Sequence, residues 1–211
     1  MPTNSRRVLH FTHGKNLPAI LAARELRCDA AAQPVCEIGD PGIKSRRECI
    51  RVPCAPGGFV SDYVPFYFAP RSPMLGSLVT GADPRVPQEH AIIYLEVSVD
   101  SLEAANAQIV YANGNAAHRL TRFAADPTNL DPPIDWPLMA ERFWANTEDD
   151  PDRQRRRQAE LLAHDVVPVR CIERIITKRP DVAARVEAIL AGASLTIPVV
   201  TMPSWYFKDP A

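Results

Sequence analysis

The stretch from Gly57 to Met74, which reads GGFVSDYVPFYFAPRSPM, constrains the fold most strongly because glycine, proline and aromatic residues are concentrated there. Its two leading glycines allow positive φ angles and the close approach of another segment, so they predict a turn. The aromatic run from Tyr63 to Phe68 then predicts a β-strand. Pro65 lacks a backbone donor and fits a sheet edge or a strand end better than a central strand. We therefore expect a short strand that follows a turn and ends at Pro70.

Two interpretations of this stretch remain open from its residues alone. It can be an ordinary buried strand with a turn at each end. It can also line a ligand site, because flat rings beside Arg71 and Ser72 suit a planar heterocycle together with a phosphate or a ribose. Side chains alternate across a strand, so Phe66 and Tyr67 cannot both face one cavity. Of these two, we prefer Tyr67 as the residue that stacks on a ligand.

Length, charge and cysteine content exclude several classes of protein. With 211 residues, the chain is long enough for one domain, 1–211, with its own hydrophobic core. Its net charge of −1 excludes a uniformly basic nucleic-acid-binding surface, so any such contact needs a local patch. Five cysteines without a C-x-x-C pair indicate reduced thiols. No segment has the apolar character of a signal peptide or a membrane span, so we expect a cytoplasmic protein with no membrane contact.

The pattern of apolar residues predicts short strands and helices joined by long loops. We expect strands at residues 8–12, 63–68, 91–99, 108–111, 160–165 and 171–177. We expect helices at residues 16–24, 74–80, 138–144, 153–158 and 182–190, with Asn16 as the N-cap of the first and Gly81 ending the second. Aperiodic segments such as 28–43 and 126–137, and 21 prolines in total, predict long loops. The expected fold is α+β, with short central β-strands and peripheral helices.

Two clusters of basic residues interrupt these elements. The first is KSRRECIR at residues 44–51, and the second lies just before Glu160. Each cluster can be a solvated helix face, and each can also bind a nucleic-acid backbone. The candidate nucleic-acid-binding residues are Arg46, Arg51, Arg153, Arg155, Arg156 and Arg157.

Three motifs in this order resemble the DarT family of DNA ADP-ribosyltransferase toxins. They are Leu9-His10-Phe11-Thr12-His13 with Asn16-Leu17, the Gly57–Met74 stretch, and Gln158-Ala159-Glu160-Leu161. Arg46-Arg47 and the terminal Trp205-Tyr206-Phe207 extend the resemblance over almost the whole chain. The resemblance implies an ADP-ribosyltransferase-like fold and an enzyme that consumes NAD as a co-substrate. We expect no metal, because histidines and cysteines lack ligand spacing, and the sequence has no P-loop or dinucleotide-binding glycine pattern.

The same resemblance assigns roles to individual residues. Glu160 matches the catalytic glutamate of the family. Arg47 matches its essential arginine, although Arg46 and Arg51 remain rivals because an alignment shifted by one residue would not select Arg47. The expected NAD-binding residues are His10, Thr12, Asn16, Phe66, Tyr67 and Arg71. His10 would hydrogen-bond the adenosine ribose, and Thr12 would face the same side of its strand. His13, on the opposite side, ranks lower.

The resemblance also implies the acceptor and the partner. We expect transfer of ADP-ribose to a base, thymine, in single-stranded DNA, and a macrodomain antitoxin that removes the modification. One alternative keeps the enzyme class but changes the acceptor to guanine in DNA, RNA or a protein side chain. Another is a non-catalytic module that binds NAD or a single strand; such a protein would be expected to lose Glu160 or Arg47, and both are present. The segment 109–146 matches little of the family, and we expect it to set the acceptor's sequence preference.

Overall fold

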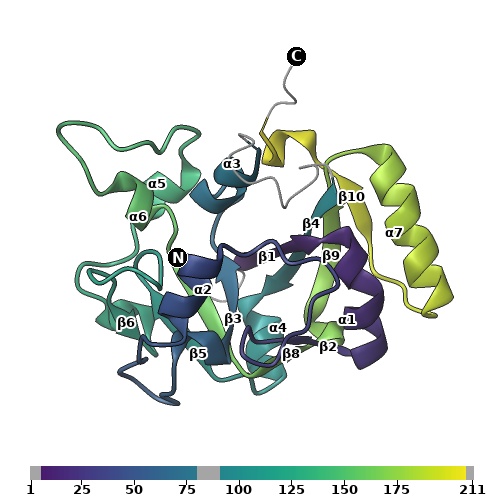
Figure 1. Ribbon diagram of the computed structural model, residues 1–211, viewed down its shortest axis with the longest axis horizontal. Coiled ribbons are helices and arrows are strands. Elements are labelled where there is room, and N and C mark those ends of the chain that lie inside the picture. The colour runs from purple at the N-terminus through teal and green to yellow at the C-terminus, as the bar shows by residue number, and fades with distance from the viewer. Residues whose placement is uncertain (1–5, 80–90, 208–211) are drawn as a thin grey trace.

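The computed structural model describes residues 6–79 and 91–207, and its centre is an eight-stranded sheet in the order β10-β9-β4-β1-β3-β7-β5-β6 (Figure 1). Its strands are β1 (Arg7–His13), β3 (Tyr63–Tyr67), β4 (Ile92–Ser98), β5 (Ile109–Ala112), β6 (Phe123–Ala124), β7 (Glu160–His164), β9 (Ile172–Thr177) and β10 (Val199–Thr201). Neighbouring strands are antiparallel except β9 and β10, which are parallel. A separate antiparallel pair is formed by β2 (Glu25–Arg27) and β8 (Val166–Pro168).

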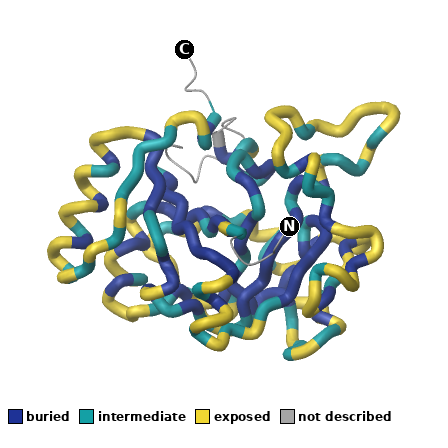
Figure 2. Tube along the Cα trace, turned by 180° about the vertical axis from the view of Figure 1, so that it is seen from behind, coloured by how far each residue is buried: buried dark blue, intermediate teal, exposed yellow. Residues whose placement is uncertain are grey.

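Helices surround the sheet. They are α1 (Leu17–Ala23), α2 (Pro41–Arg47), α3 (Pro73–Val79), α4 (Val99–Ala104), α5 (Trp136–Ala140), α6 (Arg153–Arg156) and α7 (Pro180–Gly192). Helices α1 and α7 lie side by side at one end of the molecule, and the loop between α5 and α6 projects at the other (Figure 1). Seen from behind, that loop is mostly exposed (Figure 2). The expected α+β fold of short strands and peripheral helices is confirmed. None of the described helices combines the length and the apolar character that a membrane crossing needs.

Several boundaries differ from the expected ones because of local capping. Helix α2 begins at Pro41, inside the segment expected to be a loop, because the Asp40 side chain accepts a hydrogen bond from Ile43 N at 2.9 Å. Helix α5 begins before residue 138 for the same reason, since Asp135 caps it. Asn16 does occupy the N-cap position of α1, but its side chain makes no capping bond. The expected end of the 74–80 helix, at residues 80 and 81, lies outside the described residues.

Pro65 lies in the middle of the sheet, so the expectation of an edge or a strand end was wrong. Strand β3 has β1 on one side and β7 on the other. Pro65 pairs with Leu162 of β7, while its carbonyl oxygen points towards β1 and receives His10 Nδ1 at 2.9 Å. A strand residue directs its N and its C=O to the same neighbour, so the missing donor also faces β1. Both β1 and β3 lie wholly within the described residues, and Leu9 with Tyr67 is their one residue pair in register. The missing donor of Pro65 therefore costs the sheet almost no backbone hydrogen bond.

The sheet is buried on both faces. One large cluster of apolar side chains joins the sheet to α1, α4 and α7, and includes Phe66, Leu95 and Leu161. A second cluster on the other face joins β1 and β4 to α3 and to the C-terminal segment around Tyr206. Figure 2 shows the strands as a continuous buried band between more exposed helices and loops. The strands are therefore rigid supports for any side chain placed at their ends.

Candidate active site

A buried ion pair between Arg47 and Glu160 forms the centre of the site. Arg47 Nη1 donates to Glu160 Oε2 at 3.0 Å, and the exposed fractions of the two residues are 8% and 0%. Burial acts to lower the pKa of Arg47, but the charge and the hydrogen bond of Glu160 outweigh burial and raise that pKa above its usual value. Charges buried to this degree are stable only when they are paired. The pair therefore fixes one carboxylate and one guanidinium away from bulk water.

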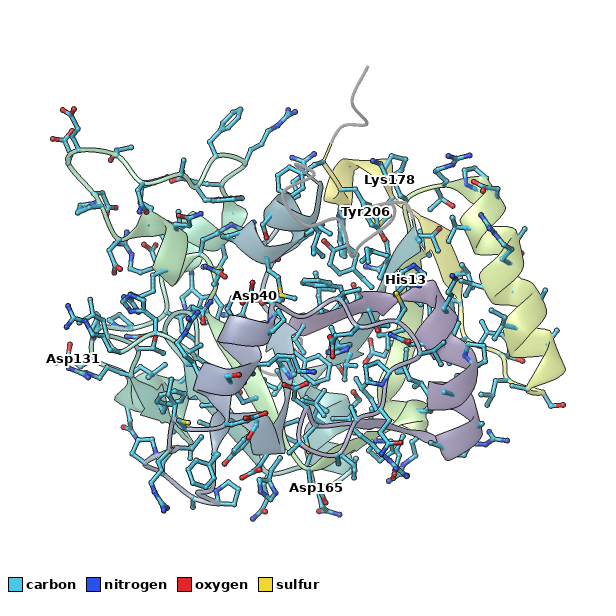
Figure 3. All side chains as sticks on the ribbon, in the orientation of Figure 1. His13, Asp40, Asp131, Asp165, Lys178 and Tyr206 are labelled. Carbon is cyan, nitrogen blue, oxygen red and sulfur yellow. The ribbon has the colours of Figure 1, made fainter. Side chains whose placement is uncertain are left out.

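Rigid elements hold both partners. Arg47 is the last residue of α2, whose first turn is capped by Asp40 (Figure 3). Glu160 is the first residue of β7, where it pairs with Tyr67 of β3 on one side and with Ala112 of β5 on the other. The carboxylate thus projects from the middle of three adjacent strands. A side chain in this position keeps its orientation because its backbone cannot move without breaking two ladders.

A loop at residues 113–122 holds the second carboxylate oxygen. Ala116 N donates to Glu160 Oε1 at 2.9 Å. Within the loop, Ala117 N donates to Asn115 Oδ1 at 2.8 Å, and Asn115 Nδ2 donates to Gln158 Oε1 at 3.0 Å. Each oxygen of Glu160 therefore has a hydrogen-bond donor, and the carboxylate has one defined rotamer.

The Arg155 side chain contacts both ends of this loop. Its Nη1 lies 3.5 Å from Asn113 Oδ1 and 3.4 Å from Thr121 Oγ1. Its Nε and Nη2 donate to the carboxylate of Asp152 at 2.7 and 2.6 Å. Gly114 packs directly against it, since a Cβ added at Gly114 would lie 2.3 Å from Arg155 Nη1 and 3.1 Å from the Arg155 backbone oxygen. The path of the loop past Arg155 therefore depends on glycine at this position.

A cavity of about 420 Å³ opens beside the ion pair. It is covered by the segment 28–40, and its floor comes from β1, β3, β7 and α2. Of the sequence-predicted residues, those that line it are His10, Thr12, Asn16, Arg47, Tyr67 and Glu160. Arg47 Nη2 is buried and has no hydrogen-bond partner in the described part of the chain. An unpaired buried donor is costly, so this atom fits a site that a ligand acceptor completes.

His10 is a neutral acceptor at this cavity. The Pro65 carbonyl oxygen can only accept, so His10 Nδ1 carries the proton in their 2.9 Å contact and Nε2 is left as an acceptor. Burial lowers the pKa of His10, the bond to Pro65 opposes this in part, and the charge of Arg47 lowers the pKa further. The imidazole is therefore uncharged at neutral pH and can accept a hydrogen bond from a ligand hydroxyl group.

Asn16 connects the covering segment to β1. Its Nδ2 donates to Thr12 Oγ1 at 3.0 Å and to Cys36 O at 2.9 Å, and its Oδ1 accepts from Cys36 N at 2.8 Å. Asn16 thus shapes the cavity by holding segment 28–40 in place. His13, on the other side of β1, accepts from Lys15 N and caps a turn after the strand (Figure 3).

The remaining expected NAD-binding residues are divided between the cavity and the core. Tyr67 lines the cavity and stacks on Phe11, with ring centroids 5.6 Å apart, whereas Phe66 is fully buried in the first apolar cluster. Arg71 does not line the cavity. Its Nε donates instead to the backbone oxygen of Tyr206, labelled in Figure 3, at 3.0 Å.

The two basic clusters differ in how their charges are satisfied. Arg46 and Arg51 are exposed, and Arg51 lies over the ring of Phe59 at 4.9 Å. In the second cluster, Arg153, Arg155 and Arg156 form ion pairs with Glu141, Asp135, Asp150 and Asp152. Arg157 is buried, and its Nη2 donates to Pro70 O at 2.7 Å. Burial is the main cause that lowers the pKa of Arg157 to about 10. Nucleic-acid binding by either cluster stays a prediction.

Sequence reasoning missed the backbone contributions to the site. Nothing in the sequence indicates that Ala116 N reaches Glu160, or that segment 28–40 covers the cavity. Gln158, which lines the cavity, could have been predicted as a site residue, because it belongs to the same sequence motif as Glu160. In residues 6–79 and 91–207, no group of histidine, cysteine, aspartate and glutamate side chains is arranged to hold a metal ion.

Comparisons with known proteins agree with this geometry. A family model described as "ssDNA thymidine ADP-ribosyltransferase, DarT" matches residues 9–207. A protein of Mycobacterium tuberculosis named DNA ADP-ribosyl transferase is 33% identical over 203 residues, which are 95% of this chain and 88% of that protein. Thermus sp. 2.9 DarT in complex with ADP-ribosylated ssDNA matches with a TM-score of 0.90 and 29% identity, covering 96% of this chain and 97% of that chain.

A second structure, Thermus sp. 2.9 DarT in complex with NAD+, matches with a TM-score of 0.83 and 28% identity over 96% of this chain and 98% of that chain. The family model covers more than nine-tenths of the sequence, and the solved structures share the whole fold. The chain therefore belongs to the DarT family of DNA ADP-ribosyltransferases.

Proposed function

We propose that the protein transfers ADP-ribose from NAD to thymine in single-stranded DNA and that it acts as the toxin of a toxin–antitoxin pair. The observation that carries the proposal is the buried Arg47–Glu160 pair at the wall of a cavity, with Arg47 Nη2 left as an unpaired donor. Family membership supplies the reaction class. A macrodomain antitoxin is the proposed partner, on the basis of the family resemblance.

The residues of the cavity fit NAD. The cavity volume lies within the range of sites for small molecules and cofactors. Arg47 Nη2 offers a planar donor to an oxygen of the ligand, and His10 Nε2 offers an acceptor to a ribose hydroxyl. Tyr67 presents an aromatic ring at the same wall. The related Thermus protein was solved with NAD+, which supports the same occupant here.

When bound, NAD supplies a ribose whose bond to nicotinamide breaks as positive charge develops at ribose C1′. The Glu160 carboxylate stabilises this charge, because it is held rigidly and shielded from water. The C1′–nicotinamide bond breaks, and a new bond forms between C1′ and N3 of thymine, the ring nitrogen that carries a proton. Glu160 then accepts that proton as the general base. Arg47 keeps the carboxylate in position, and segment 28–40 provides part of the cavity wall.

Single-stranded DNA is the acceptor that the comparisons support. A base exposed in a single strand avoids the cost of leaving a duplex stack. The structure of the Thermus relative with ADP-ribosylated ssDNA has a fold that is nearly superimposable on this one. The description of the family model, "ssDNA thymidine ADP-ribosyltransferase, DarT", supports thymine as the base.

The test is transfer of label from NAD to oligonucleotides that differ in one base. We expect labelling of thymine-containing single strands and none of duplex DNA, RNA or added protein. If only guanine, RNA or protein is labelled, the protein is still an ADP-ribosyltransferase, but thymine in single-stranded DNA is not its acceptor. If nothing is labelled and NAD is not consumed, the protein is a binding module and the proposal is wrong.

Replacing Gly114 by alanine should disturb the site without touching a reacting group. The added Cβ would meet Arg155, which Asp152 holds in place, so the 113–122 loop must move. We expect a loss of about 1–3 kcal/mol in the free energy of unfolding. We also expect the transfer rate to fall by roughly 10- to 100-fold, because Ala116 N no longer fixes the carboxylate.

Gly192→Ala is the matched control for this loop variant. A Cβ at Gly192 would meet nothing within 4 Å, and Gly192 ends helix α7, so transfer should stay at the wild-type value while stability is unchanged or rises by up to about 1 kcal/mol. Denaturant unfolding and initial transfer rates measure both effects. A Gly114→Ala protein with normal transfer would show that the loop does not position Glu160.

A further inference from the structure

A second hollow, of about 520 Å³, is lined by the same two segments that hold the Arg47–Glu160 pair. One wall comes from α2 and the residues after it, and the other comes from the 113–122 loop and β6. Arg46, next to Arg47, lines this hollow, and so does Ala117, next to the Ala116 that binds Glu160. On each wall of the hollow, one lining residue is therefore the direct sequence neighbour of a residue that binds Glu160.

The second hollow carries positive charge that carboxylates of the described residues do not neutralise. Its described lining includes no carboxylate, and Arg46 and Arg119 stand at its walls. Both arginines are exposed, and within the described part of the chain neither side chain has an ion pair or a hydrogen bond. The cations that line the first cavity, Arg27, Lys44 and Arg47, are in contrast all in ion pairs with carboxylates. The second hollow thus offers two positive charges, unpaired among the described residues, to the phosphate groups of a ligand.

The hollow also has apolar lining. Ile50, Ala117 and the half-buried ring of Phe123 contribute to it, together with polar residues such as Ser45, His118 and Thr121. An aromatic ring with guanidinium groups beside it binds single-stranded nucleic acid, because the base stacks on the ring and the phosphates meet the positive charges. A small inorganic anion would use the arginines and leave the apolar surface uncovered.

We propose that this hollow binds the nucleotide next to the modified one, with the base of this flanking nucleotide stacked on Phe123 and its phosphates held by Arg46 and Arg119. The inference rests on the proposed function, because it places the acceptor strand of that reaction. It adds residues of the segment 113–123 to the acceptor site, whereas the arginines before Glu160 are mostly paired within the protein. The flanking nucleotide is then held while the target base enters the first cavity.

Charge reversal tests the two phosphate contacts. Arg46→Glu and Arg119→Glu should each weaken binding of a short thymine-containing single strand by roughly 10-fold near 0.1 M salt. Each should also reduce the slope of log affinity against log salt by about 0.7, the change expected for one phosphate contact on a single strand. Arg170→Glu is the control, because Arg170 is exposed, lies between β8 and β9, and changes the net charge by the same amount. It should leave both quantities within about 2-fold of wild type.

Phe123→Leu separates stacking from charge. It keeps an apolar side chain against the core and removes the ring, so we expect binding to weaken about 10-fold with no change in salt slope. For all three variants the KM for DNA should rise, while binding of NAD, measured by calorimetry, stays unchanged. Thermal unfolding should stay unchanged for the two arginine variants, and Phe123→Leu should lose only a little stability, because the ring is half-buried against a core cluster. Wild-type labelling of DNA with unaltered DNA binding in these variants would overturn this inference and leave the proposed function standing. Failure of the wild type to label DNA would overturn the proposed function itself.

Discussion

Glu160→Gln should reduce transfer of ADP-ribose by about 10³-fold or more. Removal of one preorganised electrostatic contact to a transition state typically costs 10²–10³-fold, and this substitution also removes the base that accepts the thymine proton. Glutamine has nearly the same shape, so the packing around this buried side chain should stay the same. Its amide can satisfy either Arg47 or Ala116 N, but one of these donors then faces an NH₂ group. Labelled transfer under single-turnover conditions measures the chemical step directly.

Glu96→Gln is the matched control, because it separates loss of a buried charge from loss of catalysis. Glu96 is 1% exposed, lies on β4 and pairs with Arg7 and Arg174, but it does not line the cavity. Both variants should lower the free energy of unfolding by a few kcal/mol at most, since each leaves a buried or half-buried arginine without its charge partner. Only Glu160→Gln should lose transfer. If Glu160→Gln transfers ADP-ribose at the wild-type rate, Glu160 is not a catalytic residue and the mechanism is wrong.

Arg47→Ala should lose both stability and transfer. Removing one partner of a buried pair costs about 3–5 kcal/mol, because the remaining charge is left uncompensated. The Glu160 carboxylate also loses the donor that orients Oε2, so we expect the transfer rate to fall by about 10²-fold or more. Arg47→Lys keeps the charge but offers no planar second donor, and we expect it to recover stability and little activity. Urea unfolding measures the loss of stability, labelled transfer measures the loss of rate, and calorimetric titration with NAD measures cofactor binding.

Two nearby arginines provide the controls for this prediction. Arg46 and Arg51 were rivals of Arg47 in the sequence, and both are exposed outside the first cavity. Arg46→Ala and Arg51→Ala should bind NAD within about 2-fold of wild type, as is usual for exposed side chains away from a site. Weak NAD binding in either variant, with normal binding in Arg47→Ala, would reverse the assignment.

Local patterns in the sequence predicted much of the framework. The apolar strands that begin at Arg7 and at Glu160 were expected within one residue, because buried strands have continuous apolar runs and clear boundaries. The position of Arg47 opposite Glu160 was implied by family resemblance alone, since 113 residues separate them and no local pattern connects them.

What the sequence could not predict depends on long-range pairing. The acidic residues that satisfy Arg155 and Arg156 are close in the sequence, but the hydrogen bonds of Arg155 to Asn113 and Thr121 exist only in the folded chain. The aperiodic segment 28–40 was expected to be a loop, yet its role as a cover depends on the three hydrogen bonds of Asn16. Such contacts give no periodic signal, because loops satisfy their backbone groups individually.

The proline in the middle of β3 leaves little backbone pairing at the boundary between β1 and β3. Four strands lie on each side of this boundary, and one residue pair in register and the contact of His10 with Pro65 O connect the two backbones there. Side chains hold the rest of the boundary together: Phe11 of β1 stacks on Tyr67 of β3, and both apolar clusters contain residues of the two strands. The cavity lies along the same boundary, with His10 on one half and Glu160 on the other. The distance between the two walls of the site therefore depends on side-chain packing more than on the hydrogen bonds of the sheet.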